Sequence, residues 1–369
     1  MSGDASLVDA AERFADEDSR LWRWRVPVGL LATVVLLRPV LGSEYVLGYA
    51  PYANTILVWM LFAAAFNLLL GYSGLLSFGH AMFLGLGAYG TAAGIAQFEL
   101  PFLVAAPIGI GLATALAYLI GRIIARKGEI YFAMLTLAFA ESFHFVANQN
   151  YGGLTGGSTG VTGASPVWIE SERGLKYVVV GGTRFDFYFL LAAIFLVAAL
   201  SLWQIVRSPF GRSLVAVREN EALARSVGID TRQYKIWAFT FSGLFAAIAG
   251  VMFALVNSGA NLETLSIQTS GDVILMSVLG GVNYFFGPLF GVFVWLFSES
   301  WLTEFSTLVV PAVQFPLVRV DLTGVLSYWQ FFLGFIFVVA VLLAPREGLW
   351  GLTRSAVDRL YTRLGGERR

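Results

Sequence analysis

Apolar residues run in long uninterrupted stretches along almost the whole chain. Stretches of roughly 20 such residues are long enough to cross a bilayer as an α-helix, whereas strands of a transmembrane barrel would alternate. We place ten of them at residues 26–42, 46–70, 75–96, 101–121, 129–147, 186–206, 236–257, 268–286, 287–304 and 328–344. The sequence therefore predicts an all-α, polytopic membrane helical bundle with about 10 (8–10) transmembrane segments.

Two parts of this bundle are rich in glycine, at residues 75–96 and 268–304. Irregular backbone is tolerated at membrane depth only where protein or a water-filled cavity surrounds it. For each of these segments two alternatives stay open: a full crossing of the membrane, or a broken or re-entrant helix.

A charged segment at residues 207–235 interrupts the apolar pattern. Lysine and arginine favour the cytoplasmic side of a membrane, and they are concentrated here and in three other polar segments. Residues 1–25 carry four of them, 122–127 three, 207–235 six and 346–369 six, so that 19 of the 24 basic residues lie on one side if the N-terminus is cytoplasmic. We therefore predict a multi-pass protein of the cell (plasma or inner) membrane with both termini in the cytoplasm.

This orientation divides the chain into three regions. Residues 1–25 form a cytoplasmic N-terminal tail, residues 26–345 form the transmembrane domain with the cytoplasmic loop 207–235, and residues 346–369 form a basic cytoplasmic C-terminal tail. The loop is the one long charged segment between two spans, and its function is the first question that the sequence raises.

Composition narrows the possible functions. Hydrophobic residues make up 57% of the chain and charged residues 13%, with a net charge of +0, so no basic field favours a nucleic-acid partner. The chain has no cysteine and only two histidines, which excludes disulfides and thiolate metal sites. No H-E-x-x-H motif and no spaced pair of carboxylates is present, which disfavours a membrane enzyme.

The charged loop contains the pattern of a short amphipathic helix at residues 211–228. At 100° per residue one face collects small and apolar side chains, while Arg218, Glu221 and Arg225 lie opposite and are spaced for pairing. Ser208-Pro209 suits the start of the helix and Gly228 its end. The apolar face comprises Ala216, Val217, Asn220, Leu223, Ala224 and Val227.

Three interpretations of this helix compete: a helix lying on the inner leaflet, a solvated connector, and a helix inserted into the groove of a partner. Glu219 and Glu221 weaken the attraction to anionic lipid, and the apolar face has no large aromatic side chain. Small residues such as Ala216 and Ala224 permit close approach of a partner. We favour the third interpretation.

Several stretches together resemble branched-chain amino acid ABC-transporter permeases of the LivM type, with urea-importer permeases as close relatives. They are GYSGLLSFGHAMFLGLGAYG (71–90), YFAMLTLAFAE (131–141), LTGGSTGVTG (154–163), SPFGRSLVAVRENEALARSVGI (208–229) and ILMSVLGGVNYFFGPLFG (274–291), within residues 45–345. The charged loop is similar to the coupling loop of importer permeases, although Glu221 sits one place early and Leu223 interrupts the pair of small residues. The resemblance assigns ATPase coupling to Arg212, Ala216, Val217, Asn220, Glu221, Leu223, Ala224 and Gly228.

The resemblance implies a transport subunit that carries no cofactor and needs partners. These are a second homologous permease, two cytoplasmic ATP-binding subunits and an extracytoplasmic substrate-binding protein. The sequence itself also indicates that ATP is hydrolysed elsewhere. A P-loop lysine follows a glycine, and this is true of none of the chain's only lysines, Lys127, Lys176 and Lys235. Branched-chain or related amino acids are the expected substrates, and urea or a short amide remains the alternative.

Polar residues within the predicted spans are candidates for the translocation pathway, because buried polar groups in a bilayer are expensive and often functional. Glu141 and His144 are spaced to pair on one helix, which is the structural alternative to a role in the pathway. The two histidines lack a third ligand, so we expect no metal site. The candidates are Asn67, Ser77, His80, Glu141 and His144.

A self-contained secondary transporter or channel is the alternative from another class. It would need acids at mid-membrane for a coupling ion, and Glu141 is the one serious candidate. It would have no need of a docking helix in the charged loop.

Overall fold

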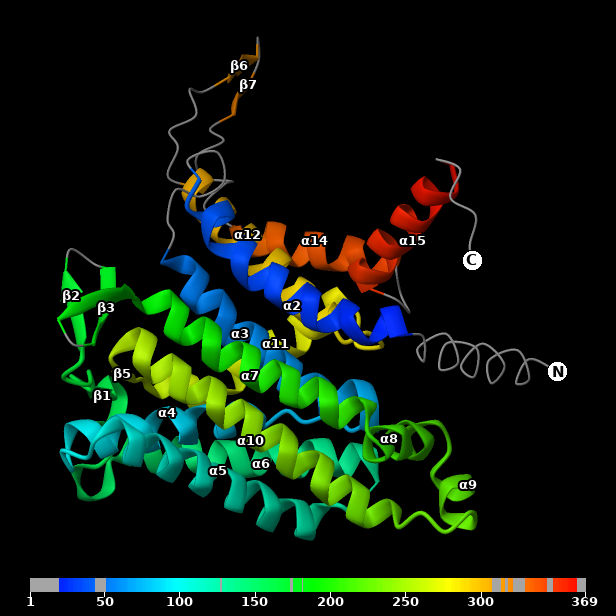
Figure 1. The fold of residues 1–369 in the computed structure, drawn as a ribbon, viewed down its shortest axis with the longest axis horizontal. Helices are drawn as coiled ribbons and strands as arrows, with labels where there is room; N and C mark the ends of the chain where they lie inside the picture. Colours follow the sequence, from blue (N-terminus) through cyan, green and yellow to red (C-terminus); the bar gives the residue numbers. More distant parts are fainter. Residues whose placement is uncertain are drawn as a thin grey trace.

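The computed structural model describes residues 20–43, 51–126, 128–172, 175–180, 182–306, 313–315, 318–320, 329–343 and 348–363. In this part of the chain the fold is a bundle of helices with short strands at one end (Figure 1). The helices are α2 (Arg20–Leu41), α3 (Tyr52–Asn67), the π-helical turn η1 (Leu68–Tyr72), α4 (Ala81–Ala96), α5 (Phe102–Ile124), α6 (Glu129–Gln149), α7 (Phe187–Arg207), α8 (Pro209–Glu219), α9 (Glu221–Ser226), α10 (Thr231–Asn257), α11 (Ile267–Gly280), α12 (Gly287–Ser306), α14 (Trp329–Leu343) and α15 (Gly348–Arg363).

The strands are β1 (Val161–Thr162), β2 (Ile169–Glu172), β3 (Leu175–Val180), β4 (Thr183–Asp186), β5 (Gly259–Ala260), β6 (Val313–Phe315) and β7 (Val318–Val320). They form antiparallel sheets in the orders β1-β5, β2-β3-β4 and β6-β7. Short 3₁₀ turns η2 (Tyr151–Gly153), η3 (Gly157–Thr159) and η4 (Leu262–Leu265) complete the described structure. Apart from Asp186 at the end of β4, no residue of these strands lies within a predicted span.

The prediction of an all-helical membrane bundle is confirmed, and each of the ten predicted spans contains a helix. Five helices of the described chain are long and apolar enough to cross a membrane: Tyr52–Tyr72, Phe102–Ile124, Glu129–Gln149, Phe187–Arg207 and Thr231–Asn257. Four apolar helices are shorter, at Val26–Leu41, Ala81–Ala96, Ile267–Gly280 and Phe331–Leu342.

Helices α3 and α10 form the centre of the bundle. Within their apolar windows 78% and 72% of residues are buried, against 33% or less in α5, α6 and α7, so the latter three lie at the periphery. Glycines set the distance between α4 and α10: a Cβ on Gly87 would strike the Ala247 carbonyl, and one on Gly250 the Leu84 carbonyl. Such small residues let helix backbones approach closely, as membrane bundles require.

The predicted break before α4 is present. Helix α3 continues through η1, and residues 74–80 then run without helical structure until α4 begins at Ala81. Where this segment ends, the Ala81 amide donates to Ser270 Oγ of α11 at 3.0 Å. Gly79 packs against the Thr136 carbonyl of α6, leaving no room for a side chain. In the same way residues 281–286, beginning with Gly281 at φ 108°, separate α11 from α12.

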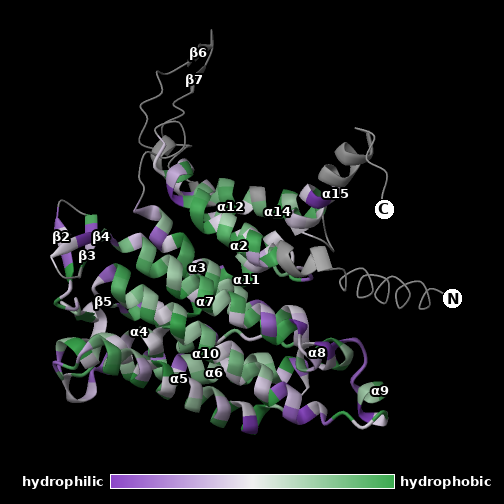
Figure 2. Cartoon of the chain, viewed as in Figure 1, coloured by the Kyte–Doolittle hydropathy of each residue, from purple (hydrophilic) through white to green (hydrophobic). Residues whose placement is uncertain are grey.

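The two ends of the bundle differ in character. Strands β1 to β5 gather at one end, whereas the start of α2, helices α8 and α9, and α15 lie at the other (Figure 1). Figure 2 shows hydrophobic residues along the bundle and hydrophilic ones at α8, α9 and the strands. Segments that we predict to be cytoplasmic therefore share one end, while the orientation itself stays a prediction.

The predicted tails contain helix. Helix α2 begins at Arg20, inside the predicted N-terminal tail, and α15 occupies residues 348–363 of the predicted C-terminal tail. Trp350 of α15 packs against Phe286 and Phe290, with ring centroids at 5.6 and 5.8 Å. Residues 1–19 and 364–369 of the two predicted tails lie outside the described chain, and the division into three regions stays a prediction.

The contact between α4 and α10 yields a prediction about stability. Gly250→Val should push α10 away from Leu84 and lower the free energy of unfolding by about 1–3 kcal/mol or more, the usual effect of overpacking. The control is Gly111→Val, since a Cβ on Gly111 of α5 meets nothing within 4 Å. Thermal unfolding in detergent measures both variants. Equal midpoints for the two would contradict the packing described here.

Candidate docking and coupling site

The charged loop folds as two helices, so the prediction of one helix over 211–228 is wrong. Helix α8 ends at Glu219, Asn220 adopts an extended conformation (φ −157°, ψ 99°), and α9 begins at Glu221. Asn220 Oδ1 accepts a hydrogen bond from the Leu223 amide at 2.9 Å and so caps α9. Asparagine is among the best N-cap residues, and here that preference outweighs continuation of the helix.

Both predicted ends of the segment are confirmed. Ser208 Oγ accepts a hydrogen bond from the Gly211 amide at 3.4 Å, with Pro209 as the first helical residue. Gly228 has a φ of 91°, and its amide bonds to the Arg225 carbonyl at 3.1 Å. The following amide, of Ile229, reaches the Ala224 carbonyl at 3.1 Å. This pair of bonds is a Schellman motif, which requires glycine or a similarly tolerant residue at that position.

The break at Asn220 splits the predicted apolar face. Val217 and Ala224 are each 3% exposed and hold the segment against the bundle, whereas Leu223 is 61% and Val227 70% exposed. Of the predicted coupling residues, those that reach the surface are Arg212, Ala216, Asn220, Leu223 and Gly228, and Glu221 is half-buried. Val217 and Ala224 therefore face the bundle, and the exposed members of the set face away from it.

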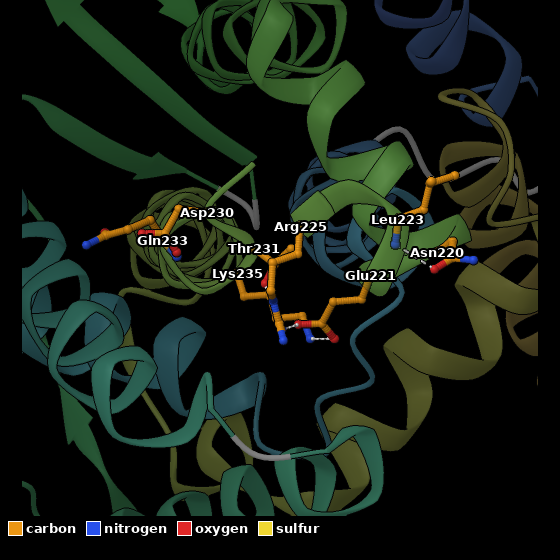
Figure 3. Close-up of polar contacts among 8 residues, drawn as sticks. All are labelled: Asn220, Glu221, Leu223, Arg225, Asp230, Thr231, Gln233 and Lys235. Atoms are coloured by element: carbon orange, nitrogen blue, oxygen red, sulfur yellow. Dashed lines mark hydrogen bonds and ion pairs between the residues drawn. The ribbon is translucent and has the colours of Figure 1, made fainter. Parts of the chain in front are cut away.

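Glu221 joins α9 to α10. Its carboxylate accepts hydrogen bonds from Arg225 at 2.9 Å and from Lys235 of α10 at 2.7 Å (Figure 3). The Lys235 side chain is only 9% exposed, whereas that of Arg225 is 68% exposed. The predicted pairing with Arg225 is confirmed. The predicted pairing with Arg218 is wrong, since the Arg218 guanidinium binds Glu219 at 2.6 Å.

The ionisation of Glu221 reflects these contacts. Burial acts to raise the pKa of Glu221, but the hydrogen bond and charge of Lys235 and the charge of Arg225 outweigh burial and hold the pKa below its ordinary value. A carboxyl with a lowered pKa in the folded state adds stability above its ordinary pKa and loses it as the pH falls through the lowered value. The link between α9 and α10 is therefore intact at neutral pH and lost only in acid.

Arg218 joins α8 to the break in the membrane. Its guanidinium donates to the Gly71 carbonyl in η1 and to Asn283 Oδ1, at 3.5 Å, in the loop between α11 and α12. Its methylene chain covers Gly74, where a Cβ would come within 2.8 Å of Arg218 Cγ. One side chain of the charged segment thus contacts both irregular backbone stretches of the bundle.

Three of the five predicted pathway residues lie in the interior of the subunit. Asn67 is 2% exposed and donates to the Tyr284 carbonyl at 3.2 Å, and Ser77 is fully buried. His80 is also fully buried: its Nε2 lies 3.0 Å from Ser242 Oγ, and its ring packs among phenylalanines. These rings belong to Phe62, Phe66 and Phe83, with centroids 5.4–5.7 Å away.

The other two pathway candidates lie on the peripheral helix α6. Glu141 is exposed and His144 half-buried, and no hydrogen bond or ion pair among the described residues joins them. The exposed face of α6 also carries Tyr131, Met134 and Phe145, at 67%, 63% and 55%. By contrast, the exposed face of α5 is aliphatic, with Leu103, Val104, Ile108, Leu112, Leu119 and Ile123.

Sequence reasoning missed Lys235 and the contacts of Arg218 to Gly71 and Asn283. Lys235 follows Glu221 by 14 residues across a turn, so no helical spacing connects them. A lysine at the start of an apolar span was the available signal, because a buried charge needs a partner. Within the described residues no group of three or more histidine, aspartate and glutamate side chains could hold a metal ion.

The fold and these contacts define a polytopic helical membrane protein with a folded charged segment at one end. The chain belongs to the family described as the permease component of the branched-chain amino acid transport system, whose profile matches residues 49–341. The predicted resemblance is thereby confirmed.

Two kinds of import permease are among the relatives of this chain. The chain is 28% identical over 277 residues to the high-affinity branched-chain amino acid transport permease protein LivM of Escherichia coli (strain K12), covering 70% of this chain and 64% of the relative. It is 25% identical over 336 residues to LivM of Salmonella typhimurium, covering 87% and 74%. The autoinducer 2 import permease LsrC of Enterobacter sp. (strain 638) is 28% identical over 182 residues, or 47% of each chain. No solved structure matches the chain.

The two cations on Glu221 differ in burial, which gives a matched pair of variants. Lys235→Met should lower the free energy of local unfolding of α9 by about 1 kcal/mol. This is the usual contribution of a charge-assisted hydrogen bond, reduced because Glu221 is partly exposed. Arg225→Met removes the exposed ion pair with Glu221 and should change the same free energy by no more than about 0.5 kcal/mol. Hydrogen exchange of the amides of residues 221–226 measures both. A larger increase of the exchange rate in Arg225→Met than in Lys235→Met would overturn this ranking.

Proposed function

We propose that this chain is the membrane-spanning permease subunit of an ABC importer for branched-chain or related amino acids. An external binding protein delivers the substrate and two separate cytoplasmic ATPase subunits supply the energy. The observation that carries the proposal is the structure of the α8–α9 segment. The segment is folded and packed on the bundle, yet it exposes apolar side chains at its tip, Leu223 and Val227. Family membership and the resemblance to LivM proteins support this class of substrate.

The exposed tip supports a protein partner for the segment. Leu223 and Val227 are 61% and 70% exposed on a segment otherwise rich in charge. Apolar side chains rimmed by polar residues are typical of protein–protein contact sites. The ATPase therefore docks on Ala216, Leu223 and Val227, and the buried Val217 and Ala224 hold the docking segment in place.

Helix α6 supports a second, homologous permease as partner. Glu141 lies well inside this 21-residue apolar helix and is exposed in the single subunit. A carboxylate at membrane depth faces the interior of a bundle or a water-filled cavity, and lipid is the least favourable surrounding. The α6 face with Glu141 and His144 therefore meets the second permease and borders the substrate pathway, whereas the aliphatic face of α5 meets lipid.

The contacts of Arg218 support a route for coupling. Movement of α8 on its ATPase would act on the Gly71 carbonyl in the π-helical turn η1 and on Asn283 in the non-helical loop between α11 and α12. Such stretches absorb a change of backbone angles more readily than a continuous helix does. Asn67, which donates to Tyr284 in the same loop, would move with them.

Uptake by the assembled complex tests the function. The chain, its partner permease, the ATPases and the binding protein are reconstituted in liposomes with ATP inside or outside. Labelled leucine should enter only with ATP on the ATPase side and binding protein on the other. Labelled urea in place of leucine tests the alternative substrate. Leucine transport by this chain alone, without ATP, would contradict the proposal and support a self-contained transporter.

Loss of the Arg218 contact should uncouple the complex. In Arg218→Gln the ATPases should still bind and hydrolyse ATP, while leucine uptake falls about tenfold, equivalent to about 1.4 kcal/mol. Arg354→Gln, which removes an exposed arginine of α15, is the charge-matched control and should transport normally. ATP hydrolysis and leucine uptake, measured on one preparation, show whether the two are uncoupled. Uptake equal to that of the control would show that coupling does not pass through Arg218.

A further inference from the structure

A basic cleft lies where α5 ends and α10 begins. It has a volume of about 620 Å³ and is bordered by the end of α5, Gly128, α9 and the turn into α10. Its charged lining consists of Arg126, Arg225, Arg232, Lys235, Glu221 and Asp230. Four cations against two acids leave an excess of positive charge.

The two acids of the cleft are already engaged. Glu221 binds Arg225 and Lys235, and Asp230 Oδ1 accepts the Gln233 amide at 3.2 Å as the N-cap of α10. Arg126 and Arg232 have no carboxylate partner among the described residues.

Arg232 is incompletely satisfied even though part of it is buried. Its Nε is buried without a hydrogen-bond partner among the described residues, and a terminal nitrogen makes a long 3.4 Å bond to the Arg122 carbonyl. A buried guanidinium donor left without an acceptor is costly. Arg232, which lines the cleft, therefore carries a charge that no described carboxylate neutralises.

The exposed aliphatic face of α5 leads directly to this cleft. Exposed aliphatic residues follow α5 down to Leu119 and Ile123, at 56% and 61%, and Arg126 continues the same face at the helical spacing of three residues. Beside them Tyr118 and Trp237 pack at 5.7 Å, with Trp237 43% exposed. Aromatic rings of this kind mark the level of the lipid headgroups.

We propose that this cleft binds the phosphate of an anionic phospholipid headgroup, through Arg126 and Arg232. The acyl chains would lie along the aliphatic face of α5, and the aromatic pair Tyr118–Trp237 would lie beside the glycerol region. Basic pockets between transmembrane helices on the cytoplasmic side are suited to anionic headgroups. The continuity between the aliphatic stripe and the cleft favours a lipid over an acidic side chain of the ATPase as occupant. This proposal does not depend on the transported substrate.

The full chain in nanodiscs provides the test. Wild type, Arg126→Gln/Arg232→Gln and the charge-matched control Arg212→Gln/Arg354→Gln are placed in phosphatidylcholine alone, with added phosphatidylglycerol, or with inorganic phosphate. Phosphatidylglycerol should raise the unfolding midpoint of wild type and control, and the first double variant should lose most of that shift. Native mass spectrometry should show at least one phosphatidylglycerol fewer on that variant. Equal shifts in all three proteins would overturn the proposal.

Two further arms identify the occupant. Arg126→Lys/Arg232→Lys keeps the charge and should retain most of the shift, which separates anion binding from a folding defect. Inorganic phosphate in phosphatidylcholine that matches the effect of phosphatidylglycerol would overturn the lipid assignment. In the cysteine-free chain, a single Gly128→Cys reports access to the cleft, and phosphatidylglycerol should slow its labelling. If the ATPase subunits slow labelling in phosphatidylcholine alone and phosphatidylglycerol does not, the occupant is the ATPase.

Discussion

The bond between Glu221 and Lys235 is the interaction on which the account of the charged segment depends. Lys235 lies near the start of α10, which packs against α3, α4 and α5 at the centre of the bundle. A buried ammonium requires a partner, and Glu221 supplies it from α9 at 2.7 Å. Helix α9 has only six residues and could not be stable alone. The ion pair therefore makes a short segment part of the rigid body and leaves Leu223 and Val227 facing outward.

A second constraint acts within the membrane, where every backbone group needs a partner. The chain leaves helical structure at residues 74–80 and 281–286, and both stretches contact neighbouring elements: Gly79 packs on the Thr136 carbonyl, and Asn67 donates to the Tyr284 carbonyl. Arg218 contacts both from outside the bundle. Gly87 and Gly250 permit the close packing of α4 on α10, whereas other glycines, Gly79 and Gly281, lie in the breaks. The docking segment and the breaks thus form one connected unit.

The sequence predicts the helices well because apolar runs, a Pro-led helix start and a terminal glycine depend on local chemistry. All ten spans contain a helix, and Ser208 and Gly228 end the charged segment as expected. Two kinds of feature escape local reasoning. The capping strength of Asn220 competes with a continuous helix, and helical periodicity alone cannot decide that competition. The contacts of Glu221 with Lys235 and of Arg218 with Gly71 join residues 14 and 147 positions apart, which only the tertiary fold brings together.

The central claim is that the exposed tip of α8–α9 is the surface on which the ATPase docks. Co-purification of the ATPase subunits with Val227→Asp tests it most directly, with Val167→Asp as the matched control, because Val167 is fully exposed in the loop that precedes β2. The account predicts that Val227→Asp retains the fold and the partner permease but loses the ATPases by about tenfold or more, about 1.4 kcal/mol per factor of ten. The control should retain them. Equal recovery of the ATPases with both variants would contradict the account.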